Sequence, residues 1–341
     1  KAISAFSNAI LRDARVFHLD GPDFLDQYMK QGKIEVDSSG AIAWSKSGPE
    51  EIKAQALERY HTEGWGSSLR QAMGLTVRLW IMRGYMDQMI RRRYDVSVEF
   101  IGRALEFLKW GAETWKDSST SDRGIVFSPS FIVGVHALYL DAYLNATQSD
   151  PKRFSMETLY KDAQDLLKEC EDVVLPDESL GDPGFKMSFT TYPKGRALST
   201  IAFYHAKIAE RLLAGQNAKA ELEKILQHSR SSAEHYMQSA FEYPVDEEMH
   251  VWFLVCAVQN FWRAGAPLHV TLPLLELIRA NLPRMRKIWE HSPLTRDNKH
   301  TYEYMLKMED EFRKAIAEGK VTDEAQVSPD QFAPPFSEDY E

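Results

Sequence analysis

The apolar residues of this chain recur with the three-to-four-residue spacing of amphipathic helices along most of its length. The clearest stretch begins at Tyr94 and continues to about Trp115, with its apolar residues on one helical face. A preceding segment, from Leu69 to about Ile90, shows the same spacing, and only a few polar residues separate the two. Two such helices joined by a short turn form a helical hairpin. The pattern predicts this hairpin as the unit on which the fold is built.

The same spacing predicts more helices on both sides of this hairpin. They cover residues 3–18, 49–60, 129–146, 155–173, 195–214, 217–241, 247–264 and 298–318, with shorter helices at 271–282 and 284–291 that Pro283 separates. A single hairpin would leave an apolar face exposed to water, so neighbouring hairpins are expected to stack. The sequence therefore predicts an all-α protein.

Residues 33–44 show a different pattern. Ile34 and Val36 alternate with polar residues, a Ser-Ser-Gly turn follows, and Ile42 and Trp44 then alternate again. A period of two around such a turn is typical of a β-hairpin. An isolated hairpin is marginally stable in water, so we expect this one to pack on the helices.

Two segments lack a helical pattern. Residues 174–193 contain three prolines and two glycines, which indicates either a functional lid or binding segment or a plain insertion. Residues 319–341 are polar, contain prolines and end in acidic residues, which predicts an extended or disordered tail. The expected organisation is an N-terminal region at 1–48, a helical repeat domain at 49–318 and a tail at 319–341.

Composition narrows the classes of partner. The chain has 341 residues, 44% of them hydrophobic, and a formal net charge of −9. This content suffices for a core, and the charge disfavours nucleic acid and acidic membranes as partners. The basic runs at 91–93 and 284–287 fall at predicted helix ends, where cations offset the helix dipole. No apolar run is long enough to span a bilayer. A cytoplasmic location is expected, with a nucleocytoplasmic one left open.

The sequence contains no common nucleotide-binding, serine-hydrolase or zinc-protease motif. Its two cysteines, Cys170 and Cys256, are too few for a disulfide framework or a thiolate metal site. His205, His228 and His235 could hold zinc if two helices brought them together, but none forms the close helical pair that such sites favour. We therefore predict no catalytic residue, no metal ligand and no cofactor.

Glu247 and His250 have the spacing of the Glu-x-x-His motif in di-iron helical bundles. Such a site needs two copies of the motif and two further glutamates, and the chain has one copy. The acidic residue also falls at a predicted helix start, where the helix dipole favours it. A structural role is the favoured interpretation.

Residues in three of the predicted hairpins resemble the tetratricopeptide repeat family. They are Leu79-Trp80, Gly84, Tyr85, Tyr94-Asp95, Phe100, Ala104-Leu105 and Leu108 in the first; Trp252, Ala257, Gly265, Leu275-Glu276 and Pro283 in the last; and, more weakly, Ala202, Ala206, Gly215, Ala218 and Leu222. Small residues are expected where two helices cross closely. The resemblance covers about 60–70% of the chain and implies a right-handed α-solenoid of stacked helical hairpins.

The resemblance also implies a function. In such arrays the first helix of each hairpin lines a concave groove that binds a peptide or helix of a partner protein. The candidate groove residues are Tyr85, Gln88, Tyr139, Tyr143, Tyr204, Lys207, Asn260 and Arg263. The expected role is that of a protein-binding scaffold or adaptor. The lysine and asparagine pattern with which some members clamp a peptide carboxylate is missing, which argues against that class of ligand.

Two alternatives stay open. The protein could be an enzyme or small-ligand binder whose helical pocket is covered by residues 174–193 and uses His205 or His250, although the residues favour a non-catalytic role. It could also pair with itself as a homodimer. The sequence leaves the oligomeric state undetermined.

Overall fold

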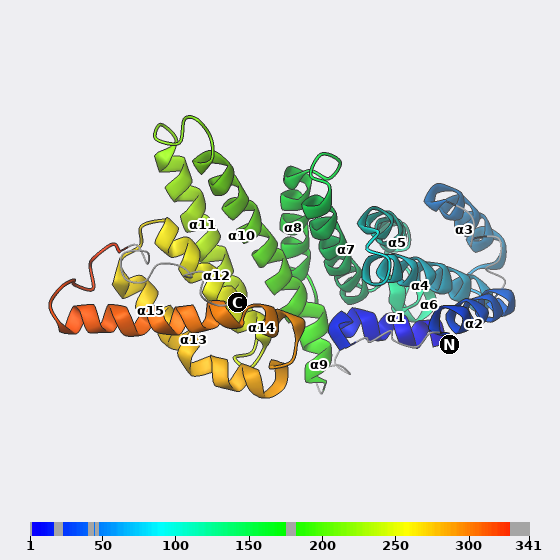
Figure 1. Ribbon diagram of the computed structural model, residues 1–341. Coiled ribbons are helices and arrows are strands. Elements are labelled where there is room, and N and C mark those ends of the chain that lie inside the picture. The colour runs from blue at the N-terminus through cyan, green and yellow to red at the C-terminus, as the bar shows by residue number, and fades with distance from the viewer. Residues whose placement is uncertain (1, 17–22, 40–43, 45–47, 175–181, 328–341) are drawn as a thin grey trace. The chain divides into compact units, whose positions relative to one another are not determined.

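The computed structural model describes residues 2–16, 23–39, 44, 48–174 and 182–327. Within these residues all regular secondary structure is helical (Figure 1), which confirms the predicted all-α class. The chain divides into two compact units, Lys1–Pro193 and Lys194–Glu341, called unit 1 and unit 2 here. The repeat region predicted at 49–318 therefore extends over both units.

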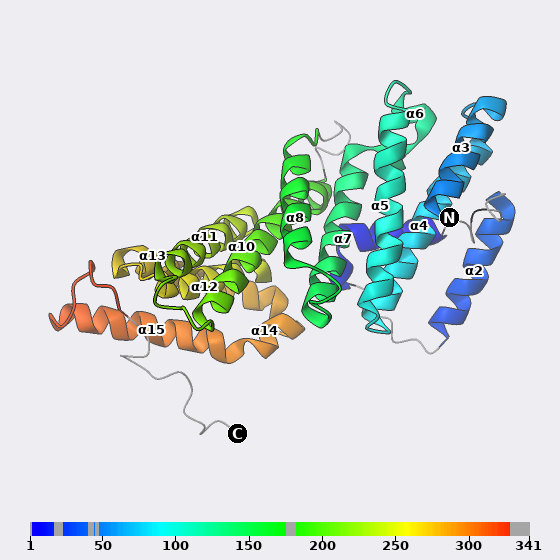
Figure 2. The ribbon, with the colours of Figure 1, turned by 90° about the horizontal axis from the view of Figure 1, so that it is seen from above.

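Unit 1 contains long helices with short turns between them. They are α1 (Ala2–Arg12), η1 (Ala14–Val16), α2 (Phe24–Ser39), α3 (Pro49–Glu63), α4 (Ser67–Met89), α5 (Tyr94–Thr114), α6 (Thr120–Arg123), η3 (Ile125–Phe127), α7 (Pro129–Ser149), α8 (Met156–Glu171), α9 (Pro183–Lys186) and the π-helical η5 (Met187–Thr191). Helix α4 packs on α5, α5 on α7 and α7 on α8, while α1, α2 and α3 contact α4 (Figure 2).

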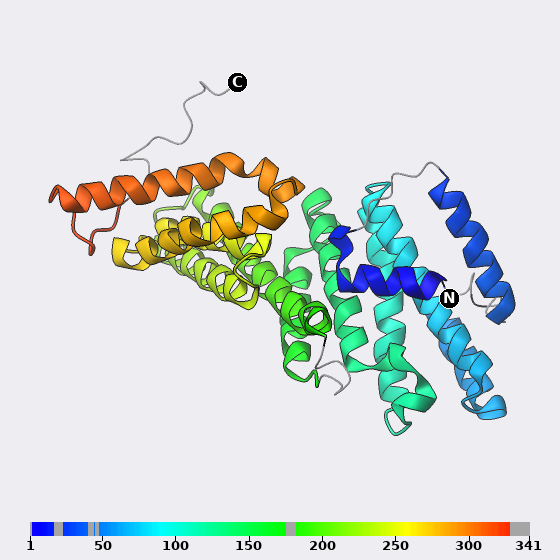
Figure 3. The ribbon, with the colours of Figure 1, turned by 90° about the horizontal axis from the view of Figure 1, so that it is seen from below.

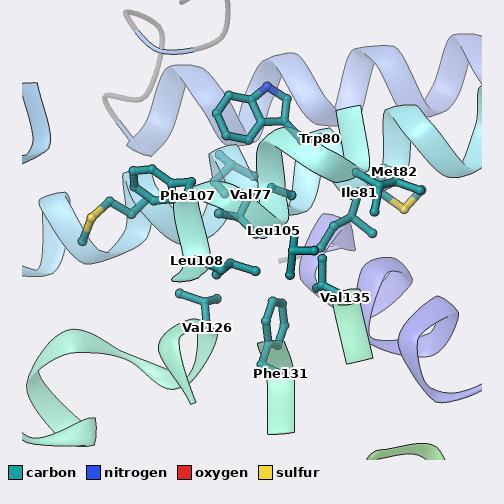
Figure 4. Close-up of a cluster of buried hydrophobic side chains, with 14 of the residues drawn as sticks. Val77, Trp80, Ile81, Met82, Leu105, Phe107, Leu108, Val126, Phe131 and Val135 are labelled. Carbon is teal, nitrogen blue, oxygen red and sulfur yellow. The ribbon is translucent and has the colours of Figure 1, made fainter. Parts of the chain in front are cut away.

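The centre of unit 1 lies where α4, α5 and α7 meet. Ile81 of α4, Leu108 of α5 and Val135 of α7 are fully buried there, and their side chains converge in Figure 4. Figure 3 shows α1 crossing the same helices from below. The apolar residues predicted on α4 and α5 therefore form the core, and those of α4 also pack on α1, α2 and α3.

Two glycines set how closely these helices approach. A Cβ atom on Gly84 of α4 would lie 2.5 Å from Cγ1 of Ile101 on α5. A Cβ atom on Gly111 of α5 would lie 2.3 Å from Cε1 of Phe127. Since real Cβ atoms do not come this close to other heavy atoms, both positions accept only glycine at the present spacing.

The β-hairpin predicted at 33–44 is wrong, because Ile34 and Val36 lie inside helix α2. The helix buries Val36 and leaves Ile34 62% exposed. Its carboxylate at Glu35 accepts hydrogen bonds from the backbone N–H groups of Ala2 and Ile3, at 2.7 and 3.3 Å. The first N–H groups of a helix have no partner within it, so the Glu35 carboxylate of α2 caps the start of α1.

The second half of the predicted hairpin is only partly described. Residues 40–43 lie outside the described residues. Trp44 is 2% exposed, and its indole N–H donates to Oε1 of Gln55 on α3 at 2.6 Å. The guanidinium of Arg59 lies 5.2 Å from the centre of its ring. Trp44 therefore serves as an anchor on α3.

The segment predicted as a loop at 174–193 is helical from residue 183 onward, while residues 175–181 lie outside the described range. Asp182 accepts a hydrogen bond from the N–H of Phe185 at the start of α9 and forms a 2.8 Å ion pair with Arg12 of α1. The hydroxyl of Ser188 donates to the backbone oxygen of Arg12 at 2.8 Å. This part of the predicted loop is thus fastened to α1.

Unit 2 is built from α10 (Tyr192–Leu213), α11 (Leu222–Glu242), α12 (Glu248–Arg263), α13 (Leu268–Trp289), α14 (Pro293–Asp297) and α15 (Lys299–Ala317). Helix α11 packs on α12, α12 on α13 and α13 on α15. The break predicted at Pro283 is wrong, because α13 continues through it. Leu282 and Met285 on either side are buried, and this tertiary packing holds the helix together despite the N–H that proline lacks.

The tail predicted at 319–341 is ordered at its start. The N–H of Leu268 donates to the backbone oxygen of Ala325 at 3.1 Å, and that of His269 to Asp323 at 2.8 Å. These contacts satisfy N–H groups at the start of α13 that have no partner in the helix, and Val327 is 8% exposed. Residues 328–341 lie outside the described residues.

We expect opposite effects from alanine at two helical glycines of unit 1. Gly111→Ala should lower the free energy of unfolding by about 1–3 kcal/mol, because the new methyl group overlaps buried Phe127. Gly74→Ala should raise it by up to about 1 kcal/mol, because its Cβ would lie 3.8 Å from Val126, an ordinary contact, and alanine favours the helix. Denaturant unfolding of both variants checks this, and equal effects would contradict the close packing at Gly111.

Candidate functional site

Two candidate groove residues of unit 1 point into the protein. Tyr85 is 2% exposed, and its hydroxyl donates to the backbone oxygen of Ala14 at 2.9 Å. Burial and the charge of Asp13 raise the pKa of Tyr85 to about 12. The side-chain oxygen of Gln88 accepts from the hydroxyl of Ser97 at 3.0 Å. These two residues hold α4 to η1 and to α5.

The two candidates on α7 also serve packing. The rings of Tyr139 and Tyr143 lie 5.9 Å apart, and Tyr143 packs edge-on against Phe154 at 5.6 Å. Tyr139 lies against Gly102 of α5, where a Cβ atom would come within 3.2 Å of its ring. The structure thus places the four unit 1 candidates at contacts between helices.

Unit 1 holds a polar cluster that the sequence analysis missed. His136 of α7 is 1% exposed, and its Nδ1 lies 2.7 Å from Oε2 of Glu169 on α8. Lys109 of α5 places its Nζ 2.7 Å from the other oxygen of that carboxylate. Burial opposes ionisation of Glu169, but the hydrogen bonds from His136 and Lys109 hold its pKa below the ordinary value.

Asp162 lies on α8 seven residues before Glu169, or about two helical turns. One of its oxygens has no hydrogen-bond partner in the described structure. Burial raises its pKa, and both burial and the charge of Asp162 raise that of Tyr139. Lys109 and His136 are 27 residues apart in the sequence, and His136 and Glu169 are 33 apart, so no local spacing could have revealed the cluster. The network ties α5, α7 and α8 together.

The first basic run has a structural explanation. Asp87 is completely buried, and Arg83, Arg91 and Arg93 place guanidinium nitrogens 2.5, 3.0 and 3.9 Å from its carboxylate oxygens. Breaking such a cluster by removing its acid would leave several cations without a partner. This run therefore supports the end of α4 and the turn into α5.

In unit 2, two of the predicted groove residues form ion pairs with one carboxylate. Lys207 of α10 forms a 2.6 Å ion pair with Glu210, and Arg263 of α12 approaches the other oxygen of Glu210 at 3.4 Å. Tyr204 lies one turn before Lys207 on α10 and is half-buried. The surface formed by these residues is called the α10–α12 surface below.

Sequence reasoning missed two members of this surface. Glu210 joins the two helices, and the ring of Phe203 lies 5.6 Å from Nζ of Lys207. The spacing of Lys207 and Glu210, three residues apart on one helix, was a usable signal. Asn260, in contrast, is 5% exposed and donates to the backbone oxygen of Cys256 within its own helix at 2.8 Å. The Asn260 amide is therefore buried and bonded to its own helix, and it is not presented on the α10–α12 surface.

Three histidines of unit 2 meet between α10 and α11. The Nδ1 atoms of His205 and His228 lie 2.9 Å apart, so one donates and the other accepts. The rings of His205 and His235 are 5.8 Å apart, and Nδ1 of His235 faces the backbone oxygen of Ser231 at 2.7 Å. Burial and the two neighbouring histidines lower the pKa of His205 to about 4. Burial also lowers that of His228.

His250 has a structural role. Its Nδ1 lies 2.8 Å from the backbone oxygen of Ala240, and its Nε2 lies 3.0 Å from the amide nitrogen of Asn281. Both ring nitrogens are therefore used inside unit 2. Nowhere in the described parts of the chain do three or more histidine, cysteine, aspartate or glutamate side chains form an arrangement that could hold a metal ion.

Comparison with known proteins identifies no relative of this chain. No protein-family model, no curated protein and no solved structure matches this chain. Among the described helices, none combines the length and apolar character needed to cross a membrane.

Stability should fall in mild acid because of the histidine cluster. His205 has an ordinary pKa of 6.5 and a folded pKa of about 4, so below pH 6.5 the unfolded state binds more protons. The free energy of unfolding should then fall by up to about 1 kcal/mol for each unit that the pH is lowered, down to about pH 4. This figure already allows for solvent screening at the partly exposed ring.

Thermal unfolding of the full chain between pH 7.5 and 4.5 measures this effect. His205→Gln should flatten the pH dependence, whereas His300→Gln, at a side chain that is 64% exposed, should leave it as in the wild type. The same slope in all three proteins would show that the cluster does not titrate as described.

Proposed function

We propose that this protein is a helical-repeat scaffold that binds a peptide or helix of a partner protein on the α10–α12 surface. One observation carries the proposal: Glu210 forms ion pairs with both Lys207 of α10 and Arg263 of α12. This bridge brings together the first helices of two successive hairpins, α10–α11 and α12–α13. In a tetratricopeptide-like array those are the helices that line the binding groove.

The order of helices is consistent with the stacked helical hairpins of the proposed solenoid. Three hairpins occupy the regions where the sequence resembles tetratricopeptide units: α4–α5, α10–α11 and α12–α13. The hairpin α7–α8 lies between the first two of them in the sequence. Gly84 lies at the close crossing of α4 and α5, as expected for a small residue of such a unit. The proposed family likeness rests on this correspondence of order, spacing and crossing.

The chemistry of the α10–α12 surface suits a peptide. Lys207, Glu210 and Arg263 have side-chain exposures of 45, 42 and 52%, and the rings of Phe203 and Tyr204 are half-buried beside them. Aromatic rings beside exposed charges are typical of protein-binding surfaces, where the rings supply affinity and the charges orient the partner. The enzyme alternative gains no comparable support, because both ring nitrogens of His250 are engaged within unit 2 and Nδ1 of His205 faces Nδ1 of His228.

The proposal is tested by replacing the two cations. We expect Lys207→Ala combined with Arg263→Ala to weaken binding to captured protein partners at least tenfold, which corresponds to about 1.4 kcal/mol. The measurement is affinity capture with quantitative mass spectrometry, followed by titration of the partner that is most enriched by the wild type.

A matched control separates this surface from charge in general. Arg296→Ala combined with Lys299→Ala removes the same two charges from exposed positions of α14 and α15 and should leave capture unchanged. If the α10–α12 variant retains the partners and affinity of the wild type while remaining folded, this surface is not the binding site. Equal losses in both double variants would show dependence on net charge alone.

A further inference from the structure

A groove follows one face of α13 in unit 2. It has a volume of about 470 Å³ and is lined by Arg279, Leu282, Pro283, Arg286, Lys287 and Glu290 of α13 and by Leu306 of α15. The α13 residues recur every three or four positions and therefore share one side of the helix. The groove shares no residue with the α10–α12 surface.

The cations of this groove differ in their partners. Arg279 is balanced by Glu309 and Asp310 on α15, each at 2.6 Å. Arg286 and Lys287, in contrast, form no ion pair with any residue in the described ranges. Glu290 offsets part of their charge. An anionic group beside Arg286 and Lys287 would therefore gain two cations that no acid already holds.

The rest of the lining is apolar. Leu282 is buried, Leu306 is half-buried and Pro283 is exposed. A ligand that fits both the cations and the apolar lining of the groove has carboxylates next to an aromatic or aliphatic side chain. This combination is the one by which extended peptides bind grooves, with pockets for side chains and charges that set orientation.

Residues 328–341 of the same chain have this chemistry. They contain four acidic residues and no lysine or arginine, and they include Phe332, Phe336 and Tyr340. We propose that this segment binds the α13 groove of its own chain. Glu338 and Asp339 lie against Arg286 and Lys287, and Phe336 covers Leu282 and Leu306.

The length of the segment permits this contact. Hydrogen bonds join Ala325 to Leu268 and Asp323 to His269, so residue 327 lies near the start of α13. Lys287 is 19 residues farther along this helix, or roughly 28 Å at 1.5 Å per residue. Glu338 is 11 residues beyond Val327 and can reach about 36 Å when extended. The segment can therefore reverse direction and still reach Lys287.

This inference does not depend on the proposed function. A groove occupied by the chain's own acidic segment would be closed to other acidic peptides, and a competitor would have to displace that segment. The occupancy rests on ion pairs at a solvent-exposed groove, so it should weaken as salt screens them.

Zero-length carbodiimide cross-linking of the full chain tests the proposal, because it joins a lysine to a carboxylate only when the two are in contact. We expect Lys287 to be joined to Glu338 or Asp339 more often than Lys320 is, although Lys320 is closer to the segment along the chain. The cross-link at Lys287 should fall several-fold between 50 and 500 mM NaCl. It should fall similarly in Arg286→Glu and persist in Arg284→Glu, which alters a neighbouring residue outside the groove lining.

Mixing ¹⁴N- and ¹⁵N-labelled protein distinguishes the two ways of forming this cross-link. Cross-links within one isotopic species only support the proposal. Cross-links mainly between labels would assign the groove to a second copy and overturn it. Preferential joining to Lys320, or equal yields in Arg286→Glu and Arg284→Glu, would show that the segment does not bind there. Thermal unfolding of both variants confirms that each remains folded. None of these outcomes depends on binding at Lys207 and Arg263.

Discussion

The packing of unit 1 depends on how closely α5 approaches the elements on either side of it. Gly84 faces Ile101, and Gly111 faces Phe127, at distances that leave no space for a methyl group. These two contacts bring the apolar stripes of the helices together, so that residues such as Ile81 and Leu108 are completely buried. In a densely packed interior a small change of volume is not absorbed by neighbours. Side chains far from these glycines therefore depend on the spacing that they set.

Close packing also explains where the polar groups lie. Asp87 is enclosed by arginines, and Glu169 by His136 and Lys109, because an ionised group removed from water needs partners. The first backbone N–H groups of two helices likewise donate to carboxylate or carbonyl oxygens of other segments. Glu35 receives the first N–H groups of α1, and residues 323–325 receive those of α13. Segments that look like termini or loops in the sequence are thereby built into each unit.

Burial also distinguishes the candidate binding residues that serve packing from those that a partner can reach. Tyrosine is amphipathic and suits both a core with one hydrogen bond and a binding surface. Tyr85 takes the first role, since its hydroxyl reaches Ala14. Lys207 and Arg263 keep their charged ends in solvent around Glu210. The proposed peptide site therefore rests on unit 2, where charge and aromatic rings remain together at the surface.

The sequence by itself determined the helical class and the approximate extents of several helices, including α4, α5 and α12, because apolar residues at helical spacing over a long segment have few other stable solutions. It also proposed Lys207 and Arg263 as binding residues, and both pair with Glu210 in the structure. The tertiary structure decided what local pattern could not. Residues 33–39 are helical, and Glu35 among them caps the start of α1. Helix α13 continues through Pro283, with Leu282 and Met285 buried beside it. The side chain of Asn260 is buried. The cap that Glu35 provides joins residues 33 positions apart in the sequence, and no local period records such a partner.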